Sequence, residues 1–539
     1  MFKGALYISL IISVSGVIFQ LYRFRKDGQF FNRSKNENHI NSFFYIQEFL
    51  LNTFLQTKLF KAGKIRWGFH FLLFLSFLYL VIVHALHDVT SSVLFKSYDP
   101  TVDPYQFLRN LTGLLVLTGC IAFLFRRRFN IRSLQDKSIK YKGVFSIILI
   151  LLLVCSGFLL EASKIISEPV FMEMVEEYSD LDEETGLSDL KLFWKDNYNV
   201  VFTENIKTTP NGLEKGRLLN EEYCLSCHSN IKSAFISNTL AKTISNAGNI
   251  LNQYRIDTKF YVIHYMLCLL LLICLPFSRL FHVLLIPFAS SRQNLTLDSF
   301  LENKAFINIA SLYACTNCGY CSRVCSVYPN FQITGNPDVL PHWKIESVKT
   351  MMQNPGAANW WNLHAGNDEC TMCRHCTDIC PSGIDLQSLW SVLDKKLVTM
   401  GYTDNTRFIL DTSLKEWAKK EEIYTGLIPG DALSSNLADR TEAFENCIQC
   451  SICTNVCPIV DYDSNQNDIT PQQVMNLLRL GKKHLATGTR MVWTCLTCYS
   501  CQEHCPKEIR VADILLELRN AGSNRADMIQ QRPTGLINR

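Results

Sequence analysis

Cysteines at one repeated spacing are the residues of this sequence with the clearest chemistry. Sixteen of its 22 cysteines fall into four runs of the form CxxCxxCxxxC. Three thiolates at this spacing wrap one face of a 4Fe-4S cubane, and the fourth cysteine of such a run serves a neighbouring cluster. The runs are Cys315, Cys318, Cys321 and Cys325; Cys370, Cys373, Cys376 and Cys380; Cys447, Cys450, Cys453 and Cys457; and Cys495, Cys498, Cys501 and Cys505.

The exchange of fourth cysteines predicts four sets of cluster ligands, two for each pair of runs. The expected fourth ligands of the first to fourth runs are, in order, Cys380, Cys325, Cys505 and Cys457. Proline follows the fourth cysteine in three runs, as the motif requires, at Pro381, Pro458 and Pro506. The first run departs from the motif with Ser326 at this position, which leaves Cys325 the least well supported fourth ligand.

Disulfides and structural zinc are the alternative uses of so many cysteines. Disulfide scaffolds are short secreted domains whose spacings do not repeat in this way. A zinc site needs four ligands in a closed tetrahedron and has no use for the continued CxxCxxCxxxC run. The spacing therefore favours four 4Fe-4S clusters and electron transfer.

A second cysteine motif, Cys224-Leu-Ser-Cys227-His228, has the form CxxCH. This is the attachment signature of a c-type heme, in which two thioethers fix the porphyrin and the histidine binds iron. Met172 and Met174 are of the right type for the sixth iron ligand, but a methionine in such a segment also serves as core packing. The sequence leaves that ligand open.

Four histidines lie in or beside apolar stretches, where an ionisable side chain is costly unless it has a role. His264 and His282 are 18 residues apart, which is five turns or about 27 Å of an unbroken helix. His70 and His84 are 14 residues apart, about 21 Å along a helix and within about 40° of one face. In antiparallel helices, His70 would meet His282, and His84 would meet His264.

These two histidine pairs predict two bis-histidine b hemes, one at each side of a membrane. The alternative is that the histidines are isolated polar residues satisfied by their neighbours. His87 competes with His84 but lies about 100° from the face of His70 and ranks second. Pro276 is expected to kink the fifth span and weakens the argument for His282.

Five apolar runs, at 4–21, 67–87, 110–125, 143–160 and 260–278, predict membrane helices. We expect the first to be retained, because it lacks a small-residue cleavage site. The basic loops 22–66 and 126–142 indicate the cytoplasmic side of a bacterial or archaeal cytoplasmic membrane. The loop 88–108 and the insert 161–259 would then be periplasmic, and the chain after 290 cytoplasmic.

The predicted fold is mainly α: a five-helix transmembrane diheme cytochrome b bundle with a periplasmic heme c insert, followed by two α-helical domains with two 4Fe-4S clusters each. The expected boundaries are 1–290 for the membrane domain, 291–400 for the first cluster domain, 401–440 for a helical connector with a turn at Pro429-Gly430, 441–522 for the second cluster domain and 523–539 for a flexible tail. A net charge of +4 without a basic tract gives no reason to expect nucleic acid.

Two segments resemble known families. CLTCYSCQEHCPKEIRVADILLELRN resembles the C subunit of heterodisulfide reductase, and the 315–380 unit looks like a second copy. PFSRLFHVLLIP at 276–287 resembles the fifth helix of the nitrate reductase gamma subunit, a diheme cytochrome b similar to the E subunit of heterodisulfide reductase. The second resemblance implies that the matching histidines ligate heme, with quinol oxidised nearby. Arg279 would then pair with a heme propionate or snorkel to the membrane surface.

These expectations favour the membrane electron-transfer subunit of a quinone-linked oxidoreductase complex. It would pass electrons between menaquinone and a cytoplasmic heterodisulfide-reductase-like or flavoprotein partner, in a direction that the sequence does not encode. The alternatives are a quinone-independent conduit fed by a periplasmic cytochrome c, a disulfide reductase and a purely structural anchor. No Cys-Cys dipeptide and no G-x-G-x-x-G motif occurs, so disulfide and hydride chemistry would belong to a partner.

Overall fold

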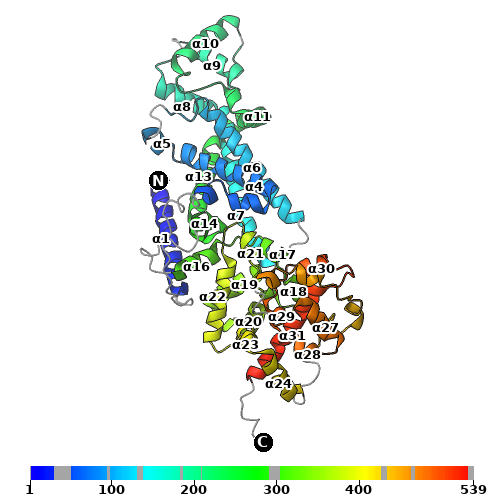
Figure 1. Ribbon diagram of the computed structural model, residues 1–539. Helices are drawn as coiled ribbons and strands as arrows, with labels where there is room; N and C mark the ends of the chain where they lie inside the picture. Colours follow the sequence, from blue (N-terminus) through cyan, green and yellow to red (C-terminus); the bar gives the residue numbers. More distant parts are fainter. Residues whose placement is uncertain are drawn as a thin grey trace. The chain divides into compact units, whose positions relative to one another are not determined.

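The computed structural model is mainly helical, without a strand in the part of the chain that it describes (Figure 1). It describes residues 2–28, 50–93, 98–129, 137–182, 186–207, 209–290, 304–357, 359–425, 434–462 and 468–531. The chain divides into two compact units. Unit 1 comprises Met1–Gln20 and Gly63–Phe281, and unit 2 comprises Leu21–Ala62 and His282–Arg539.

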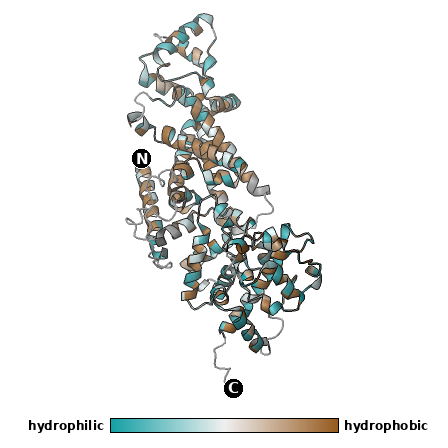
Figure 2. Ribbon diagram, viewed as in Figure 1, coloured by the Kyte–Doolittle hydropathy of each residue, from teal (hydrophilic) through white to brown (hydrophobic). Residues whose placement is uncertain are grey.

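Five helical stretches have the length and composition to cross a membrane, as the sequence predicts. Their apolar composition is visible as brown ribbon in Figure 2. Helices suit this solvent because every backbone polar group is satisfied within the segment. The stretches are Lys3–Asp27, Lys64–Ala85, Tyr105–Phe125, Val144–Ile165 and Ile256–Phe277. They make the chain compatible with a multi-pass membrane protein.

Four of the membrane-length helices pack together within unit 1. Helix α6 (Tyr105–Phe129) contacts both α4 (Lys64–Tyr79) and α7 (Lys137–Ile165), and α7 packs along α13 (Ile256–Cys274). A glycine allows close approach of α6 and α7, because a Cβ at position 113 would lie 2.6 Å from the ring of Phe158. Small residues at such contacts are typical of packing between membrane helices.

The fifth membrane-length helix is interrupted at Pro276, where the sequence predicts a kink. Helix α13 ends at Cys274 and is followed by the short 3₁₀ helices η4 (Leu275–Phe277) and η5 (Arg279–Phe281). Pro276, in η4, cannot donate a backbone hydrogen bond, so the helix cannot continue through it. A new helix, α14 (His282–Ser290), begins at the histidine itself. The five-turn geometry assumed between His264 and His282 is therefore wrong.

The insert forms a small helical core of its own. Its main helices are α8 (Glu168–Tyr178), α9 (Leu187–Asn197), α10 (Pro210–Tyr223) and α11 (Phe235–Ile244). Phe171, Leu190 and Trp194 are buried in this core. Helices α9 and α10 approach closely at Gly216, where a Cβ would lie 2.2 Å from a backbone oxygen of α9. The insert thus folds around apolar side chains.

Unit 2 contains two successive groups of helices that frame the cysteine runs. The first group comprises α16 (Lys304–Ala314), α17 (Tyr320–Arg323), α18 (Tyr328–Thr334), α19 (Pro341–Gln353), α20 (Trp360–Asp368), α21 (His375–Asp378) and α22 (Leu386–Thr399). The second comprises α25 (Ile452–Asn455), α26 (Pro458–Tyr462), α27 (Pro471–Arg479), α28 (Lys483–Ala486), α29 (Arg490–Thr494), α30 (Ser500–Glu503) and α31 (Val511–Gln531). The expected connector is helical, with α23 (Asn405–Asp411) and α24 (Leu414–Thr425), while Pro429-Gly430 lies outside the described residues.

Helix α31 corrects the prediction of a flexible tail from 523. It continues to Gln531, and Arg525 on it is buried with its Nε 2.9 Å from Oε1 of Glu421, itself buried in α24. The helix also packs against both groups, because Leu518 lies in the core of the second group while Leu516 contacts Val327 of the first. A single helix therefore holds the two groups together.

Candidate functional site

The structure gathers the sixteen cysteines of the four runs around four cavities, four to a cavity. Each cavity is lined by three cysteines of one run and the fourth cysteine of its partner run, in the groups that the sequence predicts. The groups are Cys315, Cys318, Cys321 and Cys380; Cys325, Cys370, Cys373 and Cys376; Cys447, Cys450, Cys453 and Cys505; and Cys457, Cys495, Cys498 and Cys501. Their empty volumes are similar, about 330, 400, 370 and 350 Å³.

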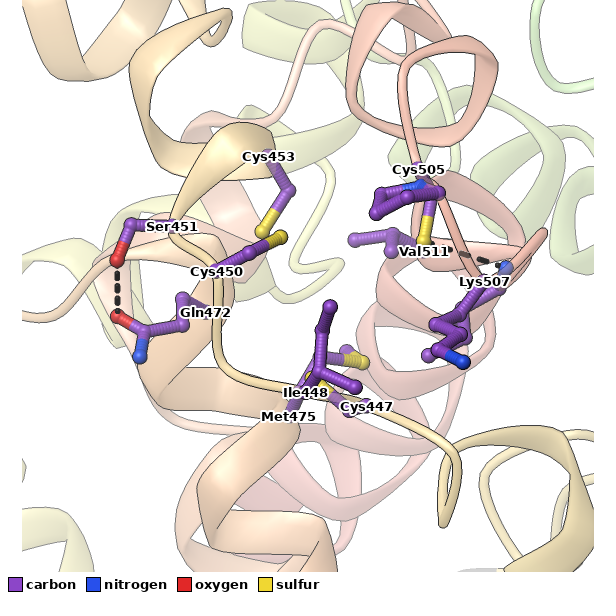
Figure 3. Close-up of a pocket in the computed structure, with 12 residues that line it drawn as sticks. Cys447, Ile448, Cys450, Ser451, Cys453, Gln472, Met475, Cys505, Lys507 and Val511 are labelled. Carbon is purple, nitrogen blue, oxygen red and sulfur yellow. Dashed lines mark hydrogen bonds between the residues drawn. The ribbon is translucent and has the colours of Figure 1, made fainter.

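The third of these cavities shows how two runs contribute to one site (Figure 3). The side chains of Cys450 and Cys453 enter from one side, and Cys505 enters from the opposite side. Ile448 and Met475 complete an apolar lining. The sulfur atoms therefore surround a volume with an apolar wall.

All four runs share one unusual backbone conformation. The residue before the second cysteine has a positive φ in each run: Asn317, Met372, Gln449 and Thr497, at 50–58°. The residue after the second cysteine does too: Gly319, Arg374, Ser451 and Tyr499, at 60–75°. Left-handed backbone in non-glycine residues is costly and concentrates at functional sites. Left-handed backbone recurs at eight matched positions, seven of them non-glycine, which shows that the runs are four copies of one structure.

Short helices carry the third cysteine of each run. These helices pack in pairs, α17 against α21 and α25 against α30. Each pair thereby brings the end of one run, where the fourth cysteine lies, beside the beginning of its partner. The pairing explains why the fourth cysteines exchange cavities.

The electrostatics of these cavities suit thiolates that have a metal partner. Burial raises the pKa of Cys380 to about 12, and the neighbouring thiols Cys318 and Cys315 contribute to this rise. Burial likewise raises the pKa of Cys453 to about 11, with contributions from Cys447 and Cys450. A bare thiolate is therefore disfavoured at these two positions, and positive iron would supply the missing compensation. The residues present thus fit a cluster of iron ions held by four thiolates.

Ser326, the departure from the motif, has a specific place beside its cavity. Its hydroxyl lies 3.0 Å from the sulfur of Cys373, and both residues line the cavity that Cys325 also lines. Cys325 faces this cavity despite the missing proline. The substitution replaces a residue without a donor by one that can donate a hydrogen bond to a ligand sulfur.

Charged side chains lie beside two cavities of unit 2, and the sequence did not single them out. Lys344 is 1% exposed, lines the same cavity as Cys373, and donates from Nζ to the carbonyl of Gly366 at 3.0 Å. Arg519 of α31 is also buried, and it donates to the carbonyl oxygens of Trp493 at 3.1 Å and Cys370 at 3.3 Å. Only the fold reveals them, because both are distant in sequence from the nearest run.

In unit 1 the structure brings together His84 and His264, as the sequence predicts. Their ring centroids lie 6.4 Å apart. Metal–imidazole bonds of about 2.0 Å, with about 1.2 Å from nitrogen to ring centre, place two rings on opposite sides of one iron about 6.4 Å apart. The two rings therefore have the separation of a bis-histidine pair.

His264 is held by neighbours on α7. Its Nδ1 lies 3.2 Å from the carbonyl oxygen of Leu153 and 3.0 Å from the hydroxyl of Ser156. A Cβ at Gly157 would lie 3.2 Å from the imidazole Cε1, so the glycine leaves room for the ring. A hydrogen bond at Nδ1 fixes the ring, and Nε2, the nitrogen that would bind a metal, lies 3.9 Å from the sulfur of Cys268.

His84 lies in a π-helical turn, η1 (Leu80–Ala85), that continues α4. The wider turn changes the angular spacing, so the 14-residue argument that relates His84 to His70 does not hold in detail. Short π segments are frequent at functional sites. His87 lies beyond this turn, half exposed, with Nε2 2.8 Å from Asp88, which agrees with its second rank.

His70 and His282 do not receive the same support. His70 lies on α4, with its ring 6.1 Å from that of Phe123. His282 begins α14 and belongs to unit 2, so its pairing with His70 stays a prediction. Arg279 lies in η5, three residues before it.

The CxxCH segment follows helix α10. Cys224 caps that helix and is buried, Cys227 is exposed, and the backbone N–H of His228 donates to the carbonyl of Cys224 at 2.9 Å. The His228 ring lies 5.9 Å from the ring of Trp194, and burial lowers the pKa of this histidine, which favours its neutral, metal-binding form. Met172 and Met174 both pack against the core that includes Cys224 and Trp194.

The loop after the second span supports the CxxCH segment. Thr101 accepts a hydrogen bond on its carbonyl oxygen from the N–H of Ser229 at 3.1 Å, and its hydroxyl donates to the carbonyl of Cys227. The N–H of Asp103 donates to the Ser229 hydroxyl at 2.8 Å. The two segments predicted to be periplasmic therefore lie together.

Comparisons with known proteins support the iron-sulfur part of the chain. Residues 311–384 and 443–509 each match the family model described as a 4Fe-4S dicluster domain. The chain is 30% identical over 87 residues to the C subunit of the H(2):CoB-CoM heterodisulfide,ferredoxin reductase of Methanothermobacter thermautotrophicus, covering 16% of this chain and 45% of that protein. It is 35% identical over 85 residues to the C subunit of the ferredoxin:CoB-CoM heterodisulfide reductase of Methanosarcina mazei, covering 15% and 48%.

The chain thus spans just under half the length of these curated relatives. No solved structure matches it significantly. The matched segments enclose all four cysteine runs. The chain therefore contains two 4Fe-4S dicluster domains, and its relatives support electron transfer through 4Fe-4S clusters.

Proposed function

We propose that this chain is the membrane electron-transfer subunit of a quinone-linked oxidoreductase complex. The observation that carries the proposal is the convergence of sixteen cysteines, four to a cavity, in a chain that also has five membrane-length helices. When bound, a 4Fe-4S cluster accepts and donates single electrons at a potential that the surrounding protein sets. The four cysteines at each cavity are the ligands of one such cluster.

Two b hemes extend the route into the membrane in this proposal. His84 and His264 ligate one of them, supported by the 6.4 Å separation of their rings and by the hydrogen bonds that orient His264. His70 and His282 ligate the other, with Arg279 as the partner of a propionate. Menaquinone exchanges electrons with these hemes.

A c-type heme on the insert continues the route outside the membrane. Cys224 and Cys227 form its thioethers and His228 its iron bond. Met172 and Met174 are candidates for the sixth ligand, and both pack against the core that includes Cys224 and Trp194. The insert is periplasmic in this proposal, and the dicluster domains are cytoplasmic, where a heterodisulfide-reductase-like or flavoprotein partner binds.

Anoxic purification of the full chain from its membrane tests the cofactor content. We expect about sixteen non-heme irons, two b hemes and one c heme per chain. His264→Ala should remove one b heme from the spectrum, and His87→Ala, its matched control, should remove none. A preparation without b heme, or a His264→Ala variant that keeps both b hemes, contradicts the membrane part of the proposal.

A quinone-independent conduit is the second candidate function. The exposure of Cys227, beside which a heme c would lie, favours it, because a periplasmic cytochrome c would have access to that heme. A quinol analogue that shifts the b-heme spectrum supports the quinone-linked function. Full reduction of the hemes by a cytochrome c, with no response to quinol analogues, supports the conduit.

A further inference from the structure

The two dicluster domains meet at two of their four cavities. The cavity of the second run and the cavity of the fourth run are linked by a hydrogen-bond contact between Thr371 and Thr497, whose hydroxyls lie 3.2 Å apart. Thr371 lines the first of these cavities, and Thr497 precedes Cys498 of the second. The cavities of the first and third runs take no part in this contact.

Tyr499 extends from one of these cavities to the edge of the other. It lines the cavity of Cys495 and Cys498. Its hydroxyl lies 3.3 Å from the carbonyl oxygen of Ser326 and 3.3 Å from Oδ1 of Asp513, so its one proton is shared between two acceptors. Its left-handed backbone, with φ of 65°, is the conformation found at this position in all four runs.

Ser326 completes the connection on the other side. Its carbonyl oxygen accepts a hydrogen bond from the Tyr499 hydroxyl, and its own hydroxyl lies 3.0 Å from the sulfur of Cys373. When Cys373 is a cluster ligand it carries no proton, so the serine is the donor. The other three runs have proline here, which has no side-chain donor. The one departure from the motif therefore lies where the two domains meet.

From these contacts we infer that Ser326 and Tyr499 are positioning residues that join the two dicluster domains into one electron relay. The inference rests on the proposed function. Along this relay the site of Cys315 adjoins that of Cys370 within the first domain. The site of Cys370 adjoins that of Cys495 across the two domains, and the site of Cys495 adjoins that of Cys447 within the second. In the step between domains one electron leaves the reduced site and arrives at the oxidised one, with no bond or proton transferred. Tyr499 and Ser326 provide the path and keep their oxidation state.

Ser326 also sets the reduction potential of the site to which Cys373 belongs. A hydrogen bond donated to a ligand sulfur stabilises the added negative charge of the reduced state. Removing it with Ser326→Ala should lower one midpoint potential and leave the other three unchanged. A tenfold change in this reduction equilibrium corresponds to about 59 mV for one electron.

Three variants at position 326 test this role by redox-titrated electron paramagnetic resonance of the purified full chain. Ser326→Ala and Ser326→Pro should lower the same midpoint potential, and the second restores the motif of the other runs, whose backbone accepts proline. Ser326→Thr keeps the hydroxyl and should restore the parent value. Ser391→Ala, at an exposed serine of the first domain, is the control. Unchanged potentials in both the alanine and proline variants overturn the inference.

The path is tested by Tyr499→Phe, which keeps the ring and removes the hydroxyl. After rapid one-electron reduction, rapid-freeze spectra should show electron redistribution between the domains slowed several-fold, with about sixteen irons still bound. Tyr462→Phe, at a tyrosine that is 91% exposed, should not change the rate. An unchanged rate in Tyr499→Phe overturns the path. A parent chain that lacks the four clusters overturns the proposed function instead, so the two failures are distinguishable.

Discussion

The two dicluster domains share one cysteine spacing and one backbone conformation, yet their cavities have different surroundings. In the first domain Cys321 and Cys380 are buried, and the fully buried ammonium of Lys344 lies at one cavity. In the second domain Cys501 is buried as well, but Cys450 and Cys498 are exposed. Lys507, which lines a cavity there, is exposed as well.

The motif therefore determines which cysteines act as ligands, whereas the fold determines the surroundings of each site. Potentials of clusters depend on burial, nearby charge and hydrogen bonds to sulfur. A buried cation acts through a low dielectric and is felt more strongly than one in water. In the proposed function, the first domain would carry electrons internally, and the second would exchange them at the surface.

The largest expected effect comes from removing a fourth cysteine from either domain. Cys380→Ala should remove the cluster of the first run, and Cys505→Ala should remove the cluster of the third run. About four irons should be lost in each case. The affected cluster belongs to the partner run because the fourth cysteines exchange cavities. Iron analysis and the disappearance of one paramagnetic signal measure the loss. Cys155→Ala, outside all four groups, is the control, and sixteen irons retained in Cys505→Ala would contradict the exchange.

A smaller effect is expected from neutralising the lysines that line the cavities. Lys344→Met should lower the potential of one cluster by roughly 59 mV, if the reduction equilibrium changes tenfold, because a buried positive charge is lost. Lys507→Met should shift its cluster less, because water screens an exposed charge. Redox titration compares the two. Equal shifts of the two potentials would show that the difference in burial between Lys344 and Lys507 does not make the two domains respond differently.

The smallest effect concerns the order in which the cysteines become reactive. During slow oxidative loss of iron, Cys450 and Cys498 should be alkylated a few-fold sooner than Cys321 and Cys380, because reagent reaches exposed sulfur first. Mass spectrometry at intervals follows the labelling. Simultaneous labelling of both domains would remove the distinction between an internal and a surface domain.

Much of unit 1 was predictable, but not all of its local geometry. The five membrane-length helices follow from composition, and the pairing of His84 with His264 from spacing. The break after Cys274 agrees with the kink predicted at Pro276, whereas the π turn around His84 did not follow, because it depends on how the helix packs. The prediction of a flexible tail was wrong as far as Gln531, since the sequence alone cannot show that Arg525 has a buried partner on another helix.

By itself, the sequence determined which cysteines share a cavity, because a local spacing and an exchanged fourth ligand leave few other arrangements. It also marked Ser326 as unusual without giving a reason. Only the tertiary structure decided what that serine touches, which two cavities adjoin and where Lys344 and Arg519 place their charge. The physical reason is range: spacing fixes neighbours within a turn or two of chain, whereas these contacts join residues 22 to 173 positions apart.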